Sequence, residues 1–453
     1  MVADHYARPL RMIALCIVIG LVGGFGALLF LWMLGIAETW FLGALGHLHP
    51  LTVAQATQMK HLALARHFDW WIPLSTTIGG LIAGVLVYTF APEAEGHGTD
   101  AAVKSYHRLD GYIRARVIVV KSIASAITIG SGGSAGREGP TAQIAAGIGS
   151  VLGRLLHLDS DEVRLLVLAG MAAGLSAIFK SPLGTAIFAI EVLYSGMHFE
   201  GRALPYTLIA ASVAYAVIGS FDGWGTLFAV PGTVVFQHPA DLLPYALLGV
   251  LGGLLATVVP SVFYGIRDAF RRLRIPPHIK PAIGGLIVGL IGVFLPQILA
   301  GGYGIIQLAV QGTIGTVVLL LLALSVFKLL TLALTVGSGG SGGVFAPSLF
   351  VGALLGAGFA ALLGHLGMTH VPVAGMALVG MACVFGAAAR VPVATVVMVA
   401  EMTGGYALMA PTMLAVGLAW LLQERLTRGW RYPTLYEAQV ERPGESPVHQ
   451  DTP

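Results

Sequence analysis

The chain has 453 residues, of which 56% are hydrophobic and only 10% are charged. Soluble domains carry roughly 25% charged residues, so this chain cannot cover a water-exposed surface with charge and lipid must cover it instead. The formal net charge of +3 is too small to indicate a nucleic-acid partner. These values predict one all-α, polytopic membrane domain in place of the two or three soluble domains that the length alone would suggest.

Apolar segments that we predict to be helices follow one another along almost the whole chain. They span 10–37, 72–91, 116–129, 141–156, 163–179, 182–195, 204–220, 242–266, 281–299, 314–336, 346–366, 372–388, 391–402 and 405–422. A perpendicular crossing needs about 20 residues, and several segments are much shorter and begin near a proline. We therefore expect broken and re-entrant helices. Irregular backbone at membrane depth must be buried in protein or line a wet cavity, so the loops between these helices mark a cavity.

A glycine-rich phrase occurs twice. Gly130–Pro140 reads GSGGSAGREGP and Gly337–Pro347 reads GSGGSGGVFAP, with seven of eleven positions identical at an offset of 207 residues. Further matches lie 210 residues apart: Leu168, Gly170, Met171, Ala172, Pro182 and Glu191 recur as Leu378, Gly380, Met381, Ala382, Pro392 and Glu401. The matches predict inverted-topology repeats at about 10–220 and 242–432, whose broken helices face one another.

Basic residues mark the cytoplasmic side of the predicted domain. They cluster at Arg8 and Arg11, at Lys104–Lys121, at Arg267–Lys280 and at Arg425–Arg431. The positive-inside rule then places both termini in the cytoplasm. We expect the membrane domain to cover 1–440. The remaining residues, 441–453, form a short polar cytoplasmic tail, too short for CBS domains.

The first glycine-rich loop predicts an anion site. Its glycines let successive backbone N–H groups point into one space, and a helix beginning near Pro140 directs its positive end at the same space. Gly136, Arg137 and Gly139 are the candidate backbone donors around it. Glu138 lies among them, and a carboxylate inside a membrane is costly enough to indicate function. Ionised Glu138 would occupy the anion site and block it, and protonated Glu138 would swing away; the alternative is an ordinary helix cap.

The second glycine-rich loop lacks the carboxylate. It carries Val344, Phe345 and Ala346 at the positions of Arg137, Glu138 and Gly139, so its amides are expected to hold the same ion from the other side. A phosphate-binding loop is excluded, because that motif requires a lysine and a hydroxyl residue after its last glycine.

Two further glutamates, Glu191 and Glu401, end apolar segments at matched positions of the two halves. Each is a candidate proton carrier or a helix-capping residue. Their symmetric placement favours the structural role, and Glu191 remains the candidate for a proton path.

These motifs resemble those of the CLC family of chloride channels and chloride/proton antiporters. GREGP at 136–140 is similar to the family's gating-glutamate motif, GVFAP at 343–347 to its GxFxP motif, and PTLYEAQ places Tyr436 at the family's pore tyrosine. The likeness extends over about 10–440 and includes the stretches 168–191 and 380–406. It implies that Glu138 is the external gate, that Val344, Phe345 and Ala346 line the central anion site, and that the Tyr436 hydroxyl donates to the anion.

The resemblance also implies how the protein works as a whole. Members of the family are homodimers in the cell membrane with one pore in each subunit, and they bind chloride ions without another cofactor or a metal. We therefore expect chloride or related anions, protons and the lipid bilayer as partners, and no nucleic acid. A membrane enzyme is the competing class, but its only faint candidate group is His97 with Asp100. We accordingly predict no enzyme activity.

The chain departs from the family pattern at His97. The segment 96–100 reads GHGTD where the family usually has GSGIP, so His97 stands in place of an anion-coordinating serine. Both the neutral and the protonated imidazole can donate a hydrogen bond to an anion. The alternative is that the side chain turns away and the backbone alone forms the site.

A second departure is Val192, because many family antiporters carry a second glutamate at this position as the internal proton acceptor. Valine cannot carry a proton. The substitution favours a channel-like or weakly proton-coupled chloride transporter. The alternative is a fully coupled chloride/proton antiporter, in which Glu191, His198, Glu200 or a chain of water delivers protons.

Overall fold

Helices make up the fold, and the described residues contain no β-strand. The computed structural model describes residues 2–59, 69–232, 234–315, 317–368 and 371–449. The α-helices are α1 (Val2–Glu38), α2 (Val53–Gln58), α3 (Ile72–Phe90), α4 (Thr99–Arg108), α5 (Ala115–Gly130), α6 (Glu138–Leu155), α7 (Ser160–Phe179), α8 (Pro182–Glu191), α9 (Leu204–Asp222), α10 (Leu242–Arg272), α11 (Lys280–Phe294), α12 (Tyr303–Gln311), α13 (Val318–Gly337), α14 (Phe345–His365), α15 (Val373–Ala388), α16 (Pro392–Thr403) and α17 (Met409–Thr427).

Eight of the described helices are long and apolar enough to cross a membrane. Four apolar helices, α8, α11, α15 and α16, are shorter, as the proline-bounded segments of the sequence predict. Large apolar side chains are exposed along the outer helices, including Phe25 and Trp32 on α1 and Leu254 on α10. An exposed apolar surface of this extent is expected against lipid.

The two halves of the chain repeat the same packing. Helix α6 packs on α7 as α14 packs on α15, α1 packs on α9 as α10 packs on α17, and α5 packs on α6 as α13 packs on α14. Helices α3 and α11 pack on each other, as do α8 and α16, which are partners across the repeat. This arrangement confirms the inverted-repeat fold class that the duplicated loops predict.

The helix breaks also repeat. Lys180 and Arg390 adopt left-handed φ values of 53° and 55°, just after α7 and α15. A left-handed residue at this position ends a helix. Pro182 and Pro392 then open α8 and α16, because proline is favoured at the first helical position. The same local signals therefore place two short helices opposite each other.

The segment 432–449, which we name the C-terminal strap, folds back on both halves of the membrane domain. Leu435 N donates to Ala388 O at 2.9 Å, and Ser195 N donates to Val440 O at 2.9 Å. Ser446 is fully buried. Within the predicted polar tail, Ser446 is anchored to His107 of α4 (Ser446 Oγ to His107 Nδ1, 2.8 Å), while Glu441 and Arg442 are exposed; residues 450–453 lie outside the described residues.

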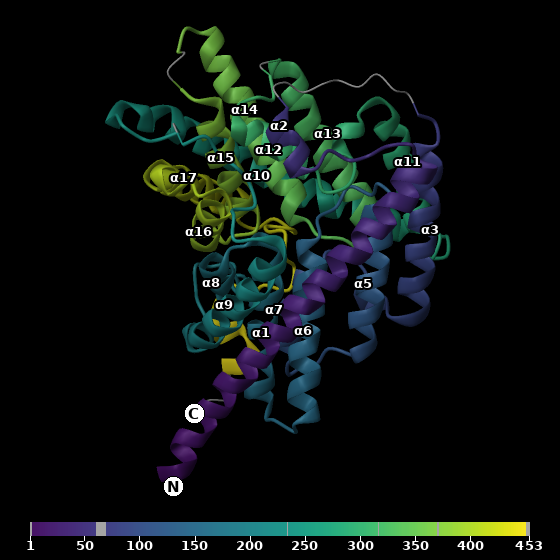
Figure 1. Cartoon of the computed structure of the whole chain (residues 1–453), viewed down its shortest axis with the longest axis vertical. Coiled ribbons are helices and arrows are strands. Elements are labelled where there is room, and N and C mark those ends of the chain that lie inside the picture. Colours follow the sequence, from purple (N-terminus) through teal and green to yellow (C-terminus); the bar gives the residue numbers. More distant parts are fainter. Residues whose placement is uncertain (1, 60–68, 233, 316, 369–370, 450–453) are drawn as a thin grey trace.

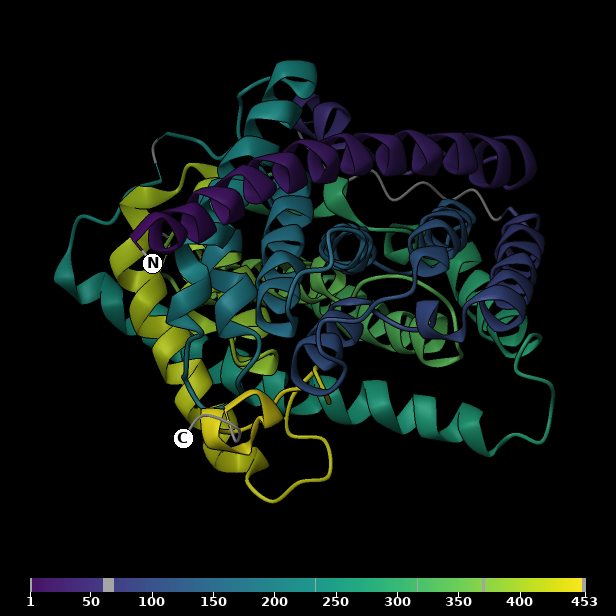
Figure 2. The ribbon, with the colours of Figure 1, turned by 90° about the horizontal axis from the view of Figure 1, so that it is seen from below.

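Both ends of the chain lie toward the same end of the molecule (Figure 1), where they are apart from each other (Figure 2). Helix α1 has 37 residues and is about 55 Å long at 1.5 Å per residue, and it runs along one side of the bundle (Figure 2). Its last residue, Glu38, therefore lies far from the end that holds both termini.

Candidate anion-binding site

Three loops that are distant in the sequence are joined through their backbones. Gly136 N donates to Gly343 O at 2.7 Å and Gly343 N donates to Gly136 O at 2.6 Å, which pairs the two glycine-rich loops antiparallel. Gly96 N donates to Gly340 O at 3.0 Å, which adds the loop that carries His97. The sequence-predicted loops therefore form one structural unit.

Each of these loops leads into a helix. Helix α4 begins at Thr99, α6 at Glu138 and α14 at Phe345, and none of the three has a side-chain N-cap hydrogen bond. The first amides of a helix have no intrahelical partner and carry a positive partial charge. Helix ends that converge in this way provide backbone donors for an anion, including those of Val344, Phe345 and Ala346.

Glu138 lies inside this junction. Its side chain is 0% exposed, and its carboxylate packs against Gly136 beside the amide nitrogen of Ala346. Neither carboxylate oxygen has a hydrogen-bond partner of standard geometry among the described residues. A buried carboxylate without firm partners is free to leave its place, which suits a mobile group better than a structural cap.

His97 faces an aromatic group that includes Tyr436. The His97 ring lies 5.4 Å from the ring of Tyr436 and 5.9 Å from that of Phe263, measured between centroids. Phe188 contacts Tyr436 at 6.5 Å and Phe345 at 6.2 Å. His97 Nδ1 is buried and has no hydrogen-bond partner within the described part of the chain. The structure therefore brings His97, Tyr436 and Phe345 to one place, with the imidazole turned toward the aromatic group.

Gly139 sits where the loops approach most closely. A β-carbon at this position would overlap the carbonyl oxygen of His97 and lie 3.0 Å from the Cα atom of Gly343. Only glycine permits this approach. The contact links the start of α6 to both of the other loops.

Two buried lysines that the sequence reasoning missed support the loops. Lys121 Nζ donates to Ala94 O at 3.0 Å and to Gly96 O at 2.7 Å, and Lys328 Nζ donates to Ile298 O at 2.8 Å and Ala300 O at 2.6 Å. Both side chains are 0% exposed, so assigning Lys121 to a cytoplasmic basic cluster was wrong. The lysines stand 207 residues apart, the offset of the glycine-rich loops, and that offset was the signal that could have found them.

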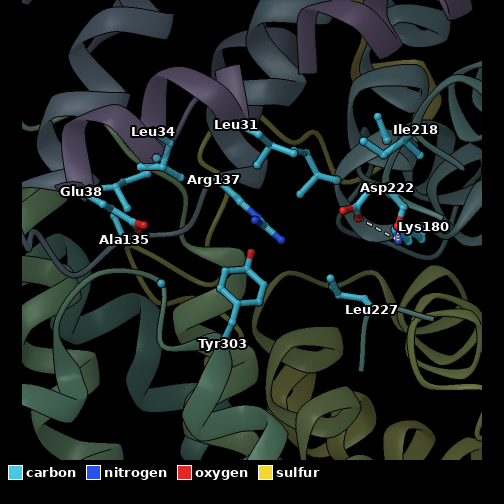
Figure 3. Close-up of a pocket in the computed structure, with 15 residues that line it drawn as sticks. Leu31, Leu34, Glu38, Ala135, Arg137, Lys180, Ile218, Asp222, Leu227 and Tyr303 are labelled. Carbon is cyan, nitrogen blue, oxygen red and sulfur yellow. Dashed lines mark hydrogen bonds and ion pairs between the residues drawn. The ribbon is translucent and has the colours of Figure 1, made fainter. Parts of the chain in front are cut away.

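The Arg137 side chain points away from the loop junction. Its guanidinium lies 4.3 Å from the centroid of the Tyr303 ring, and it lines a cavity of about 250 Å³ with Glu38, Lys180 and Asp222 (Figure 3). At the central site, Arg137 can therefore contact an anion only through its backbone amide, as the sequence predicts. Its side chain belongs to the cavity next to Glu138.

Tyr436 lines a second cavity. This cavity has a volume of about 180 Å³ and is bounded mainly by the C-terminal strap and Ser195. One cavity therefore adjoins the site through Arg137, beside Glu138, and another adjoins it through Tyr436. A pathway through the protein requires cavities that reach the site, and these two are the candidates.

Glu191 is held by helix α16. Its carboxylate accepts hydrogen bonds from Val393 N at 3.1 Å and from Ala394 N at 2.7 Å. Glu401 does the same for α8, accepting from Gly184 N at 2.8 Å. Glu191, the last residue of α8, thus caps the start of α16, and Glu401 of α16 caps the start of α8. This mutual capping supports the structural role. Val192, next to Glu191, is fully buried.

We expect Glu191→Gln and Glu401→Gln to cost stability to a similar degree. Each change places an amide N–H₂ where a carboxylate oxygen accepts from the backbone, so each is expected to destabilise the fold by about 1–3 kcal/mol. Thermal unfolding in detergent measures this loss, and proton and chloride fluxes in vesicles measure transport. A Glu191→Gln protein that keeps its stability and loses only proton flux would make Glu191 a proton carrier instead.

Comparisons with known proteins agree with these features. The family model described as "Voltage gated chloride channel" matches residues 79–424. A "Putative chloride channel protein ClcB-like" from Ralstonia nicotianae is 33% identical over 415 residues, which cover 89% of this chain and 91% of the relative. An "H(+)/Cl(-) exchange transporter ClcA" from Salmonella paratyphi A is 32% identical over 408 residues, covering 87% and 85%.

Solved structures share the fold. A slow cyanobacterial Cl⁻/H⁺ antiporter superposes with a TM-score of 0.79 at 22% identity, covering 93% of this chain and 96% of the other. A CLC-type fluoride/proton antiporter superposes with a TM-score of 0.78 at 23% identity, covering 96% and 99%. On the family model and the relatives above 30% identity, this chain belongs to the voltage-gated chloride channel (CLC) family of membrane proteins, which transport anions.

Proposed function

We propose that this protein exchanges chloride for protons, with Glu138 as both the gate and the proton carrier. The carrying observation is the fully buried Glu138 carboxylate beside the Ala346 amide, with no firm hydrogen-bond partner among the described residues. Carboxylate and chloride compete for the same backbone donors at the ends of α6 and α14. Chloride passes when the side chain leaves, and protonation removes the charge that holds it there.

Coupling follows from this competition. A neutral acid no longer competes with an anion, so each departure of Glu138 carries a bound proton and admits chloride. The relatives named as H(+)/Cl(-) exchange transporters support this mechanism. Tyr436, with an O–H donor, and His97 flank the anion on the inner side of the junction.

Passive chloride conduction is the second candidate function. It is favoured by Val192, which places no titratable group at the position where many family antiporters carry a glutamate. Under this alternative Glu138 still gates the pore, and protons only set how often it opens.

Further proposals concern the surroundings of the pore. The clusters of basic residues support a cytoplasmic location for the end of the molecule that holds both termini. The cavity at Glu38 and Arg137 then opens to the outside, because α1 carries Glu38 to the far end. A homodimer in the cell membrane, with one pore in each subunit, is the assembly that the family resemblance supports.

Purified protein in liposomes tests the function. Vesicles loaded with chloride are placed in low-chloride buffer, and a chloride electrode and a pH electrode follow both ions after the membrane potential is set with valinomycin and potassium. We expect chloride efflux that drives protons inward against their gradient. Chloride efflux without uphill proton movement would support passive conduction, and no chloride flux would refute both candidates.

We expect His97→Ala to change anion preference more than stability. The buried Nδ1 atom has no partner among the described residues, and removing an unpaired polar group costs little. A ring that donates to the anion discriminates between chloride and nitrate, so the permeability ratio should shift by several-fold, or about 1 kcal/mol. Reversal potentials with chloride on one side and nitrate on the other measure the ratio, and an unaltered ratio would show that the backbone alone selects.

A further inference from the structure

A cluster of titratable side chains lies near Val192, between α4 and the C-terminal strap. It comprises Tyr106, His107, Tyr194, Glu200 and His449, and we name it the inner cluster. Gln439 of the strap donates to Val192 O at 3.0 Å, and Glu200 N donates to Ile190 O at 3.3 Å. Glu200 of the inner cluster is therefore bonded to the backbone two residues before Val192, the position where the family resemblance calls for a proton acceptor.

Glu200 is the centre of the inner cluster. Its Oε2 atom accepts a hydrogen bond from the Tyr194 hydroxyl at 3.0 Å and lies 3.1 Å from His449 Nε2. The Tyr194 hydroxyl and His449 Nε2 are also 3.1 Å apart. Three groups that can exchange a proton thus meet at one point, and one of them comes from the strap.

The exposure of these groups falls from the surface inward. The His449 side chain is 28% exposed and that of Glu200 is 10% exposed, while Tyr194 is only 1% exposed. A proton from solvent can therefore reach His449 and pass to Glu200 without crossing an apolar layer.

His107 does not titrate in this cluster under ordinary conditions. Its Nε2 lies 2.9 Å from Leu193 O and its Nδ1 lies 2.8 Å from Ser446 Oγ, which fits a neutral ring that donates from Nε2. Burial lowers the pKa of His107 to about 4. His107 thus stays neutral near pH 7, and its hydrogen bond to Ser446 fixes the strap.

Other charged groups around Glu200 come from several elements. Arg108 on α4 and Arg164 on α7 act on His107 and Tyr106 respectively, and the His198 ring lies 6.2 Å from that of Tyr194. Arg108 and Arg164 are thus the cationic side chains that act on members of the inner cluster, and His198 is a further imidazole beside it.

Helix α4 connects the inner cluster with the anion site. It begins at Thr99, directly after the loop of His97, and carries Tyr106 and His107 at its other end. Thr99 and Tyr106 are seven positions apart, which is about 10 Å along a helix. Glu200 is therefore separated from the Tyr436 region by roughly two helical turns.

We propose that Glu200, with Tyr194 and His449, is the internal proton-loading site that stands in for the missing carboxylate at position 192. The inference rests on the proposed chloride/proton exchange. A solvent proton first forms an N–H bond at His449 Nε2, and this bond breaks as an O–H bond forms at Glu200 Oε2, 3.1 Å away. His449 returns to its neutral form and the carboxylate becomes neutral. When the proton leaves toward the pore the O–H bond breaks, and Glu200 regains its negative charge.

The test compares proton and chloride fluxes of full-length variants in the same liposomes. Glu200→Gln keeps the shape and removes the titratable group, so we expect proton flux to fall at least about tenfold while chloride still moves. Glu200→Asp restores a carboxyl group and should recover much of the proton flux. Glu441→Gln is the matched control, because Glu441 is an exposed carboxylate on the same strap, and its flux ratio should match that of the unmodified protein.

The outcomes separate the two proposals. If the unmodified protein moves chloride without protons, both the exchange function and the inner site fail. If it is coupled and Glu200→Gln keeps the same proton-to-chloride ratio, only the inner site fails. Loss of both fluxes in Glu200→Gln, with no recovery of coupling in Glu200→Asp, would show a structural role and would likewise overturn the inner site.

Discussion

Replacing Glu138 with glutamine is expected to keep chloride moving and to reduce proton flux to the leak of protein-free vesicles. Glutamine has the size of the protonated acid and cannot release a proton. The residue it replaces is fully buried and packs beside the Ala346 amide, so the change removes the negative charge that competes with chloride there. Chloride flux should also lose its dependence on pH, since no gate remains to be protonated.

The experiment measures the ratio of proton flux to chloride flux over a range of pH in the unmodified protein and in Glu138→Gln. In the unmodified protein chloride flux should rise as the pH falls, because protonation releases the gate. Glu93→Gln is a suitable control, since Glu93 is a half-exposed carboxylate in a neighbouring loop that pairs with Arg114, and such surface pairs contribute little. If the chloride flux of the Glu138→Gln protein still depends on pH, Glu138 is not the gate.

Gly139→Ala is expected to be the most damaging single change in the loops. The new β-carbon would overlap the His97 carbonyl, and the Cα atom of Gly343 lies at 3.0 Å on the other side. Backbone hydrogen bonds at Gly136 and Gly96 hold these loops in place, so neither neighbour can yield without breaking the unit. We expect overpacking to lower the free energy of unfolding by about 1–3 kcal/mol. Chloride flux per folded molecule should also fall, because the displaced loops carry the backbone donors of the anion site.

Thermal unfolding and chloride flux on the same preparation measure the two effects separately. Gly358→Ala is the matched control, because a β-carbon on this glycine of α14 would meet nothing closer than 3.6 Å. It should stay within about 0.5 kcal/mol of the unmodified protein. Normal chloride flux in Gly139→Ala would mean that the three loops do not form the pathway.

The sequence was sufficient for the site loops because glycine patterns and helix starts are local signals. Gly130–Pro140 and Gly337–Pro347 could be matched without a structure, and their offset predicted that they face each other, as the bridge between Gly136 and Gly343 shows. Glu138 could be chosen because a charged residue in an apolar context is rare. The starts of the short helices α8 and α16 could be predicted from Pro182 and Pro392, because proline at the first helical position is also a local signal.

The remaining features depend on contacts between distant segments. Glu191 caps α16 across a separation of 202 residues, and neither its neighbours nor its spacing predicts that partner. The direction of the Arg137 side chain is decided by the Tyr303 ring, which belongs to the other half of the chain. The C-terminal strap appears polar in sequence, and only its hydrogen bonds to Ser195 and Ala388 reveal that it is packed.

The reversal potential of the purified protein in a planar bilayer tests the central claim of proton-coupled exchange through Glu138 most directly. Chloride is held at a fixed gradient, and a pH gradient is then imposed. Exchange predicts a reversal potential that moves with the pH gradient and returns to the chloride equilibrium value in Glu138→Gln. A potential that stays at the chloride equilibrium value in the unmodified protein would contradict it.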